Sequence, residues 1–221
     1  MKRTILLMFL VLLLMGGCKD IKNNQDLKDA DPKDLPDTIA MQDDFTRDFM
    51  ASAEEEEEGY YLFESKTGGY TMLYPVNSNL DDIYYQKRHD SYEALHFGES
   101  KESSDVPFYV RATYNHGEVA DRLSTQFKLL SGSLDYDGEY EEIELDNKVI
   151  YFARKKYITK GGNRSSYRFF GLIKSNDPEQ IVRYKYNVIC FDEQKGCDYD
   201  LDAIEEEVKQ LMKSIEFTTK D

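Results

Sequence analysis

Cysteine and histidine are both scarce in this 221-residue sequence, which contains three of each. The histidines His89, His96 and His116 stand alone, without a second histidine at the i, i+4 spacing that holds a metal on a helix. The sequence also lacks a Gly-x-Ser-x-Gly motif and a phosphate-binding loop of the Walker type. We therefore predict no catalytic residues, no cofactor and no metal site.

Long apolar runs are almost absent, and the single one is short. Eleven residues, Ile5–Met15, follow a lysine and an arginine and lead into Gly16-Gly17-Cys18. A helix that crosses the hydrocarbon core needs about 20 residues, so this run is too short for a membrane span. Its layout is that of an export signal with a lipobox, whose cysteine is lipidated and becomes the new N-terminus. We predict a signal peptide over 1–17, acylation of Cys18 (with palmitate), and an anchor on the extracytoplasmic face of the cell membrane.

Basic residues are outnumbered, with 28 Lys and Arg against 43 Asp and Glu, which gives a net charge of −15. An acidic surface repels the phosphates of nucleic acids and anionic lipid head groups. We expect no nucleic-acid partner, and we expect the chain to reach the membrane through its lipid at Cys18.

Two cysteines remain once Cys18 is assigned to the lipid. Cys190 and Cys197 are separated by six residues, and the polar stretch between them ends in glycine, as a loop does. In an exported protein such a close pair predicts a structural disulfide. Metal ligation and a redox pair are the alternatives. The first lacks further Cys or His nearby, and the second normally has Cys-x-x-Cys spacing.

Composition divides the chain into a tether and a domain. Residues 18–58 are rich in Asp, Asn and Glu, which predicts a flexible acidic tether. Within it, residues 39–50 carry apolar side chains at spacings near four, and a short docked helix and disorder are equally compatible with them. Residues 59–217 predict a single globular domain, and 218–221 a tail.

The apolar periodicity of the domain predicts an α+β fold. Spacings of three and four predict a helix from Val119 that Gly132 stops, and a final helix begun by Asp200 or Asp202. Short connections favour an antiparallel β-sheet meander in the second half, with the two helices packed on the sheet. The expected strands are 60–66, 70–74, 92–98, 108–114, 139–145, 149–158, 167–175 and 180–191.

Several short blocks carry a resemblance to a known family. Asp31-Pro-Lys-Asp-Leu-Pro36, Gly59-Tyr-Tyr-Leu-Phe-Glu-Ser-Lys66 and Met72-Leu-Tyr-Pro75 resemble the YvcA-type lipoproteins of Gram-positive bacteria, and the two late cysteines fit that pattern. The resemblance implies a lipid anchor and carries no biochemical activity. The order of elements, ending in Lys-Ser-Ile-Glu-Phe217, is more remotely similar to the Mog1/PsbP-like fold, an α/β/α sandwich. Members of that fold are mainly binding or assembly factors, and fold alone does not fix function.

One basic cluster stands out in the acidic chain. Arg154, Lys156, Arg164 and Arg168 lie on two strands that we expect to pair, which makes them a candidate ligand or partner patch. Cross-strand pairing with nearby glutamates is the simpler interpretation. The leading hypothesis is a non-enzymatic lipoprotein with a binding or assembly role, whose expected partner is another protein of the cell envelope. The alternative is a small-ligand-binding or sensor lipoprotein that uses this basic and aromatic patch.

Overall fold

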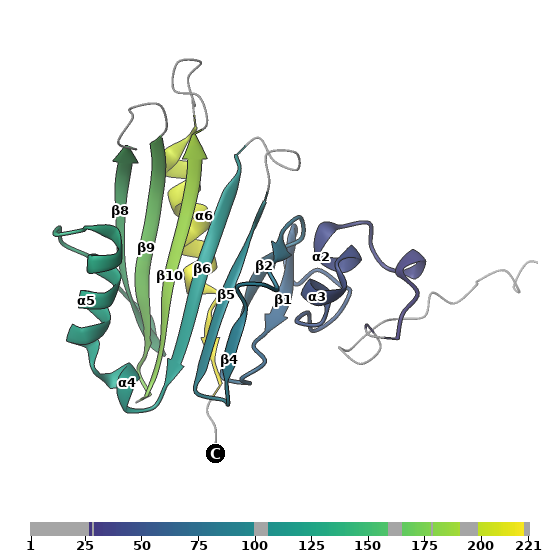
Figure 1. Ribbon diagram of the computed structural model, residues 1–221, viewed down its shortest axis with the longest axis horizontal. Helices are drawn as coiled ribbons and strands as arrows, with labels where there is room; N and C mark the ends of the chain where they lie inside the picture. Colours follow the sequence, from purple (N-terminus) through teal and green to yellow (C-terminus); the bar gives the residue numbers. More distant parts are fainter. Residues whose placement is uncertain are drawn as a thin grey trace, which may run out of the picture.

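The computed structural model describes residues 27, 29–99, 106–158, 165–177, 179–190 and 199–218, and the predicted signal peptide lies outside these ranges. The described residues form three layers (Figure 1). A long antiparallel sheet is the middle layer. The side of this sheet that helix α5 partly covers is called the outer face. The side that packs against helix α6 and a small second sheet is called the inner face.

The long sheet has eight strands in the order β3-β5-β6-β10-β9-β8-β7, with β4 paired to β5. Strands β7 to β10 follow one another as neighbours, which confirms the predicted meander. The strands are β3 (Asn79–Leu80), β4 (Gln86–Arg88), β5 (Tyr92–Glu99), β6 (Phe108–His116), β7 (Glu141–Glu144), β8 (Lys148–Ile158), β9 (Ser165–Ser175) and β10 (Gln180–Cys190).

Strand β6 lies beside β10, although 63 residues separate the end of one from the start of the other in the sequence numbering. The chain leaves β6 through the short helix α4 (Glu118–Asp121) and the helix α5 (Leu123–Leu134), which pack on the outer face, and then enters β7 at the far edge. The long-range pairing of β6 with β10 therefore joins the β3–β6 half of the sheet to the β7–β10 half.

The helices match the predicted α+β class, and two of their ends differ from the expectation. Helix α5 runs through Gly132 and ends at Asp135, whose φ of 50° is left-handed. A glycine inside a helix costs only about 1 kcal/mol relative to alanine, so it does not stop the helix. Helix α6 (Leu201–Lys213) begins at Asp200, whose side chain accepts a hydrogen bond from the Ala203 N–H at 3.0 Å.

Helix α6 packs its apolar stripe against the inner face, beside the small sheet β1-β2-β11. Strands β1 (Tyr60–Glu64) and β2 (Tyr70–Pro75) form the predicted hairpin, and β11 (Glu216–Phe217) pairs with β2. The first residue of the predicted tail is hydrogen-bonded to the β1–β2 turn, because the Thr218 N–H donates to the Gly69 carbonyl at 2.9 Å. The remaining tail residues lie outside the described ranges.

The predicted flexible tether is wrong for residues 29–38 and 51–58, which belong to the folded domain. Of the two alternatives open for residues 39–50, the structure shows the docked one, as two short helices. The turn η1 (Pro32–Asp34) and the short helices α2 (Ile39–Gln42) and α3 (Asp44–Arg47) lie here. Ala40, Met41, Phe49 and Met50 are buried, and the Phe49 and Phe63 rings stack with centroids 5.4 Å apart. The acidic composition does not reveal that this segment is folded. A few buried apolar side chains are enough to hold it on the domain when the neighbouring polar groups have hydrogen-bond partners. The buried Arg47, for example, donates to the Met41 carbonyl at 2.6 Å.

One fully buried carboxylate joins the hairpin to the long sheet. Glu93 on β5 is 0% exposed. Its oxygens accept hydrogen bonds from the Ser65 hydroxyl (2.7 Å), the Lys66 backbone N–H (3.0 Å), the Tyr70 phenol (2.9 Å) and the Tyr85 phenol (3.0 Å). Burial, and then the Glu93 charge, raises the pKa of both phenols, so each stays protonated as a donor.

Glu93→Ala should destabilise the domain strongly, because four donors lose a buried acceptor. We expect a loss of about 3–5 kcal/mol in the free energy of unfolding, seen in urea denaturation followed by tyrosine fluorescence. Glu64→Ala, at an exposed position in β1, is the matched control and should change stability by less than about 0.5 kcal/mol. Equal stabilities of the two variants would contradict the role given to Glu93.

Candidate anion-binding face

The alternation of side chains in β6, β10 and β9 brings four cations onto the outer face. Arg111 on β6 pairs directly with Lys185 on β10, and Arg183 is two residues away on the same strand. Arg168 on β9 pairs with Asn187, again on this face. Directly opposed Cβ atoms in a sheet lie about 4.5–5.5 Å apart. Arg111, Arg168, Arg183 and Lys185 are called the basic cluster below.

No carboxylate of the described residues forms an ion pair with any member of the basic cluster. Other cations of the domain do have such partners, for example Lys174 with Asp121 (3.3 Å) and Lys209 with Glu141 (2.9 Å). Within the cluster, Arg183 donates to the Gln126 side-chain oxygen at 2.8 Å. The Arg168 guanidinium lies over the Tyr157 ring, 4.2 Å from its centroid, and its Nε is buried without a hydrogen-bond partner among the described residues.

The electrostatics agree with an uncompensated cluster. The pKa of Lys185 is lowered, first by burial and then by the charges of Arg111, Arg183 and Arg168. The pKa of His96, which pairs with Arg111 across β5 and β6, is lowered by burial and then by Arg111, while Asp81 opposes the shift. Burial and the cluster therefore both disfavour the charged form of His96. An anionic group on this face would relieve the mutual repulsion of the cations.

Two hollows flank the basic cluster on the outer face. One, of about 200 Å³, lies where α5 meets the sheet, and its lining includes Arg183, Lys185 and Ser133. The other, of about 340 Å³, lies over β5 and β6, and its lining includes Tyr84 and His96. The described part of the chain places no helix over β5 and β6 here, so this side of the cluster faces solvent (Figure 1).

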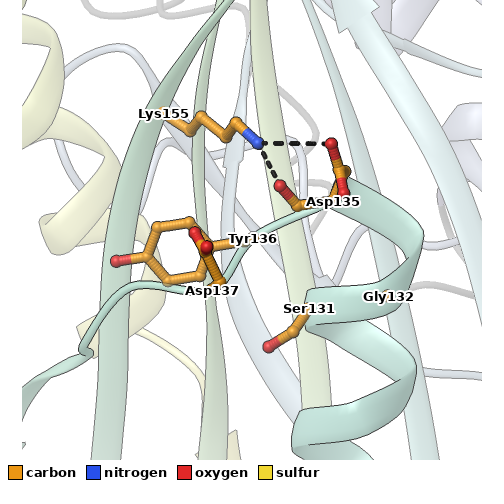
Figure 2. A pocket seen from close by; sticks show the side chains of 6 residues that line it. All are labelled: Ser131, Gly132, Asp135, Tyr136, Asp137 and Lys155. Carbon is orange, nitrogen blue, oxygen red and sulfur yellow. Dashed lines mark hydrogen bonds and ion pairs between the residues drawn. The ribbon is translucent and has the colours of Figure 1, made fainter.

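A third hollow, of about 290 Å³, lies at the C-terminal end of α5 (Figure 2). Lys155 is the cation that lines it, and Figure 2 shows its amino group directed at Asp135, whose backbone carbonyl and carboxylate it contacts. Asp137 also lines this hollow. Because its cation is already paired and two carboxylates surround it, this hollow does not suit an anion.

The patch predicted from the sequence is wrong as a single surface, because the strand register divides it. Lys155, not Arg154 or Lys156, pairs with Arg168. Arg154 and Lys156 point to the inner side of the sheet, where Arg154 contacts Glu205 of α6 at 2.7 Å and Lys156 lies over the Tyr167 ring. Arg168 alone belongs to the basic cluster, and Arg164 lies outside the described residues.

Sequence reasoning missed Arg111, Arg183 and Lys185. The signal was present, because each of these cations alternates with buried apolar residues inside a strand. What the sequence did not show was the pairing of β6 with β10, and that pairing brings them together.

The predicted cysteine sites are only partly within the described ranges. Cys190 ends β10 and is 1% exposed, whereas Cys18 and Cys197 lie outside. Lipidation of Cys18 and the pairing of Cys190 with Cys197 stay predictions. Within the ranges that the structure describes, no group of three or more His, Cys, Asp or Glu residues is placed to hold a metal ion. None of the helices there combines the length and apolar character of a membrane span.

Comparison with known proteins identifies a family of lipoproteins. Residues 36–216 match the family model described as "Putative lipoprotein YvcA". A protein of that name from Bacillus subtilis (strain 168) is 35% identical to this chain, with 98% of the chain and 97% of the relative covered. The chain therefore belongs to the YvcA lipoprotein family.

Solved structures with a similar arrangement are distant. The Ran-binding protein Mog1p of Saccharomyces cerevisiae is 12% identical, with a TM-score of 0.45 over 71% of this chain and 94% of the yeast protein. A crystal structure from Bacteroides thetaiotaomicron is 10% identical, with a TM-score of 0.42 over 74% of this chain and 50% of the other.

Lys185→Gln should stabilise the domain, because it removes repulsion within the basic cluster. The sign follows from the pKa, which lies below the ordinary 10.5 in the folded state. Protonated Lys185 therefore costs stability at neutral pH, and the cost is relieved as the pH rises through the lowered pKa. We expect Tm to rise by about 1–3 °C at low salt in scanning calorimetry, and less at 1 M salt.

The matched control is Lys174→Gln on the same face, which breaks the pair with Asp121 and should leave Tm unchanged or lower it. If Lys185→Gln lowers Tm instead of raising it, Lys185 is a structural residue and the predicted repulsion is wrong.

Proposed function

We propose that this protein is a lipid-anchored, extracytoplasmic binding protein that holds an anionic component of the cell envelope on its basic cluster. Membership of the lipoprotein family and the Cys18 context support the anchor. The single observation that supports the binding role is a set of four cations without carboxylate partners among the described residues, in a chain of net charge −15. That the ligand is bound without being chemically changed is part of the proposal.

The folded N-terminal segment keeps the domain close to the membrane. The eleven positions from Cys18 to Asp29 span at most about 40 Å even when fully extended. An anchor at Cys18 therefore confines the domain to the zone next to the membrane surface. Cys190 and Cys197, if joined as we propose, would fasten the end of β10, the strand that carries Arg183 and Lys185.

The anchor is tested by Cys18→Ala in cells that export the full chain. We expect the wild type in the membrane fraction and the variant in soluble form outside the cytoplasm, because one acyl-bearing residue supplies the attachment. Cys190→Ala is the matched cysteine control and should stay with the membrane. Retention on membranes of Cys18→Ala protein from which residues 1–17 have been removed would disprove the anchor.

Anion binding is tested with inorganic tripolyphosphate and the detergent-solubilised full chain, by titration calorimetry at two salt concentrations. Arg111→Gln with Lys185→Gln should weaken binding about tenfold or more, because charge-assisted hydrogen bonds are lost. Arg154→Gln with Lys156→Gln removes the same charge from the opposite face and should have little effect.

Equal losses in the two double variants would show that net charge alone governs the affinity. That result, or no measurable binding by the wild type, would refute the proposed function.

A further inference from the structure

The hollow over β5 and β6 contains aromatic side chains that the fold leaves exposed. Tyr84 is 54% exposed and Tyr109 38% exposed. The Tyr84 ring stacks on His96, with centroids 5.0 Å apart and planes 17° from parallel. Gly98 lies directly opposite Tyr109 in the register and has no side chain, so the sheet surface beside the Tyr109 ring is uncovered. The result is a flat, open platform rather than part of the core.

A carboxylate, not a cation, accompanies the aromatic rings in this hollow. Asp81 lines it, whereas the Glu99 side chain lies on the same side of β5 as Phe97 and points to the inner face. Asp81 is oriented by the backbone N–H groups of Ile83 and Tyr84, at 3.0 and 3.4 Å. An aromatic face accepts the C–H side of a sugar ring, while carboxylates accept hydrogen bonds from its hydroxyls. A phosphate placed beside the Asp81 carboxylate would be repelled.

The hollow leads directly into the basic cluster. His96, Arg111 and Lys185 are successive cross-strand partners on β5, β6 and β10. Two strand spacings, about 10 Å, separate the first from the last. One sugar unit and an acid group attached to it can span both regions.

We propose that the ligand of this face is an anionic glycan, whose sugar ring lies on Tyr84 and Tyr109 while its acid group binds Arg111 and Lys185. This inference rests on the proposed function and names the chemical class of its ligand. The separation of charges carries the argument: the Asp81 carboxylate borders the platform, and donors form the cluster. A ligand with a neutral, hydroxylated ring beside an acid group fits both. A nucleic-acid strand, which repeats its phosphate beside every ring, fits the cluster but not the platform.

The test measures binding of four probes to the full chain by titration calorimetry. The acidic glycans are an oligogalacturonate hexamer, which carries carboxylates, and a sugar polymer linked by phosphodiesters. Maltohexaose is the neutral glycan, and a thymidine hexanucleotide is the nucleic acid. Tripolyphosphate from the preceding test gives the affinity for an anion without a sugar. We expect at least one acidic glycan to bind about tenfold more tightly than every other probe, and the better of the two identifies the acid group.

Tyr84→Ala should weaken binding of that glycan about fivefold to tenfold and leave tripolyphosphate binding unchanged. Ile83→Ala is the matched control, because Ile83 is the neighbouring residue, is 82% exposed and does not line the hollow. It should bind like the wild type. Arg111→Gln should weaken both ligands. Unchanged thermal unfolding of each variant confirms that the effects are local.

The glycan inference fails, while the anion-binding function stands, if Tyr84→Ala binds the acidic glycan as the wild type does. It fails in the same way if tripolyphosphate or the hexanucleotide binds as tightly as the glycans. If tripolyphosphate shows no measurable binding to the wild type, the proposed function itself fails.

Discussion

The burial of the inner face of the long sheet is the constraint on which the outer face depends. Inner residues of β5, β6, β9 and β10 pack against α6 and the hairpin, so their alternate neighbours must point outward. A slip of one residue would turn every side chain to the other face and bury Arg111 or Lys185 in an apolar core. The packing that stabilises the fold therefore also fixes the register that groups the cations. The cluster is built into strands rather than loops, which limits how far its members can move.

Buried charged groups fasten the elements that cover the inner face. Glu93 holds the β1–β2 turn and Tyr85 against β5. On β8, across the inner face from β5, the buried Lys148 donates to the Ile215 carbonyl at 2.7 Å and pairs with Glu216 of β11. Both groups are satisfied by hydrogen bonds, the condition under which a buried charge is tolerated. They connect the small sheet to the long one at two separate points, one at the hairpin and one at the C-terminal strand.

Local patterns were sufficient to predict the hairpin, the meander and α6, because each depends on neighbouring residues. Tyr and Phe alternate in β1, the turns of the meander are short, and α6 has an apolar stripe at helical spacing. The prediction from composition failed for residues 29–58, where the burial of a few side chains such as Met41 and Phe49 stabilises the folded segment despite its many exposed acidic residues. The prediction of the basic site from the sequence failed for a different reason. Assigning the basic residues to a shared face needs the pairing of β6 with β10 and the offset between β8 and β9. A one-residue error in either moves a cation to the opposite face, and no local signal fixes such a register.

The contrast between the acidic chain and its basic cluster determines what kind of recognition is available. A net charge of −15 repels polyanions at long range, so diffusion is not steered toward this face. Screening limits that repulsion to about 10 Å at 0.1 M salt. Within that distance the nearby cations dominate, and their partial burial strengthens each contact with an anion. A ligand must therefore present its acid group at the right place to gain from the cluster. Recognition on this face would therefore favour selection by shape over indiscriminate attraction.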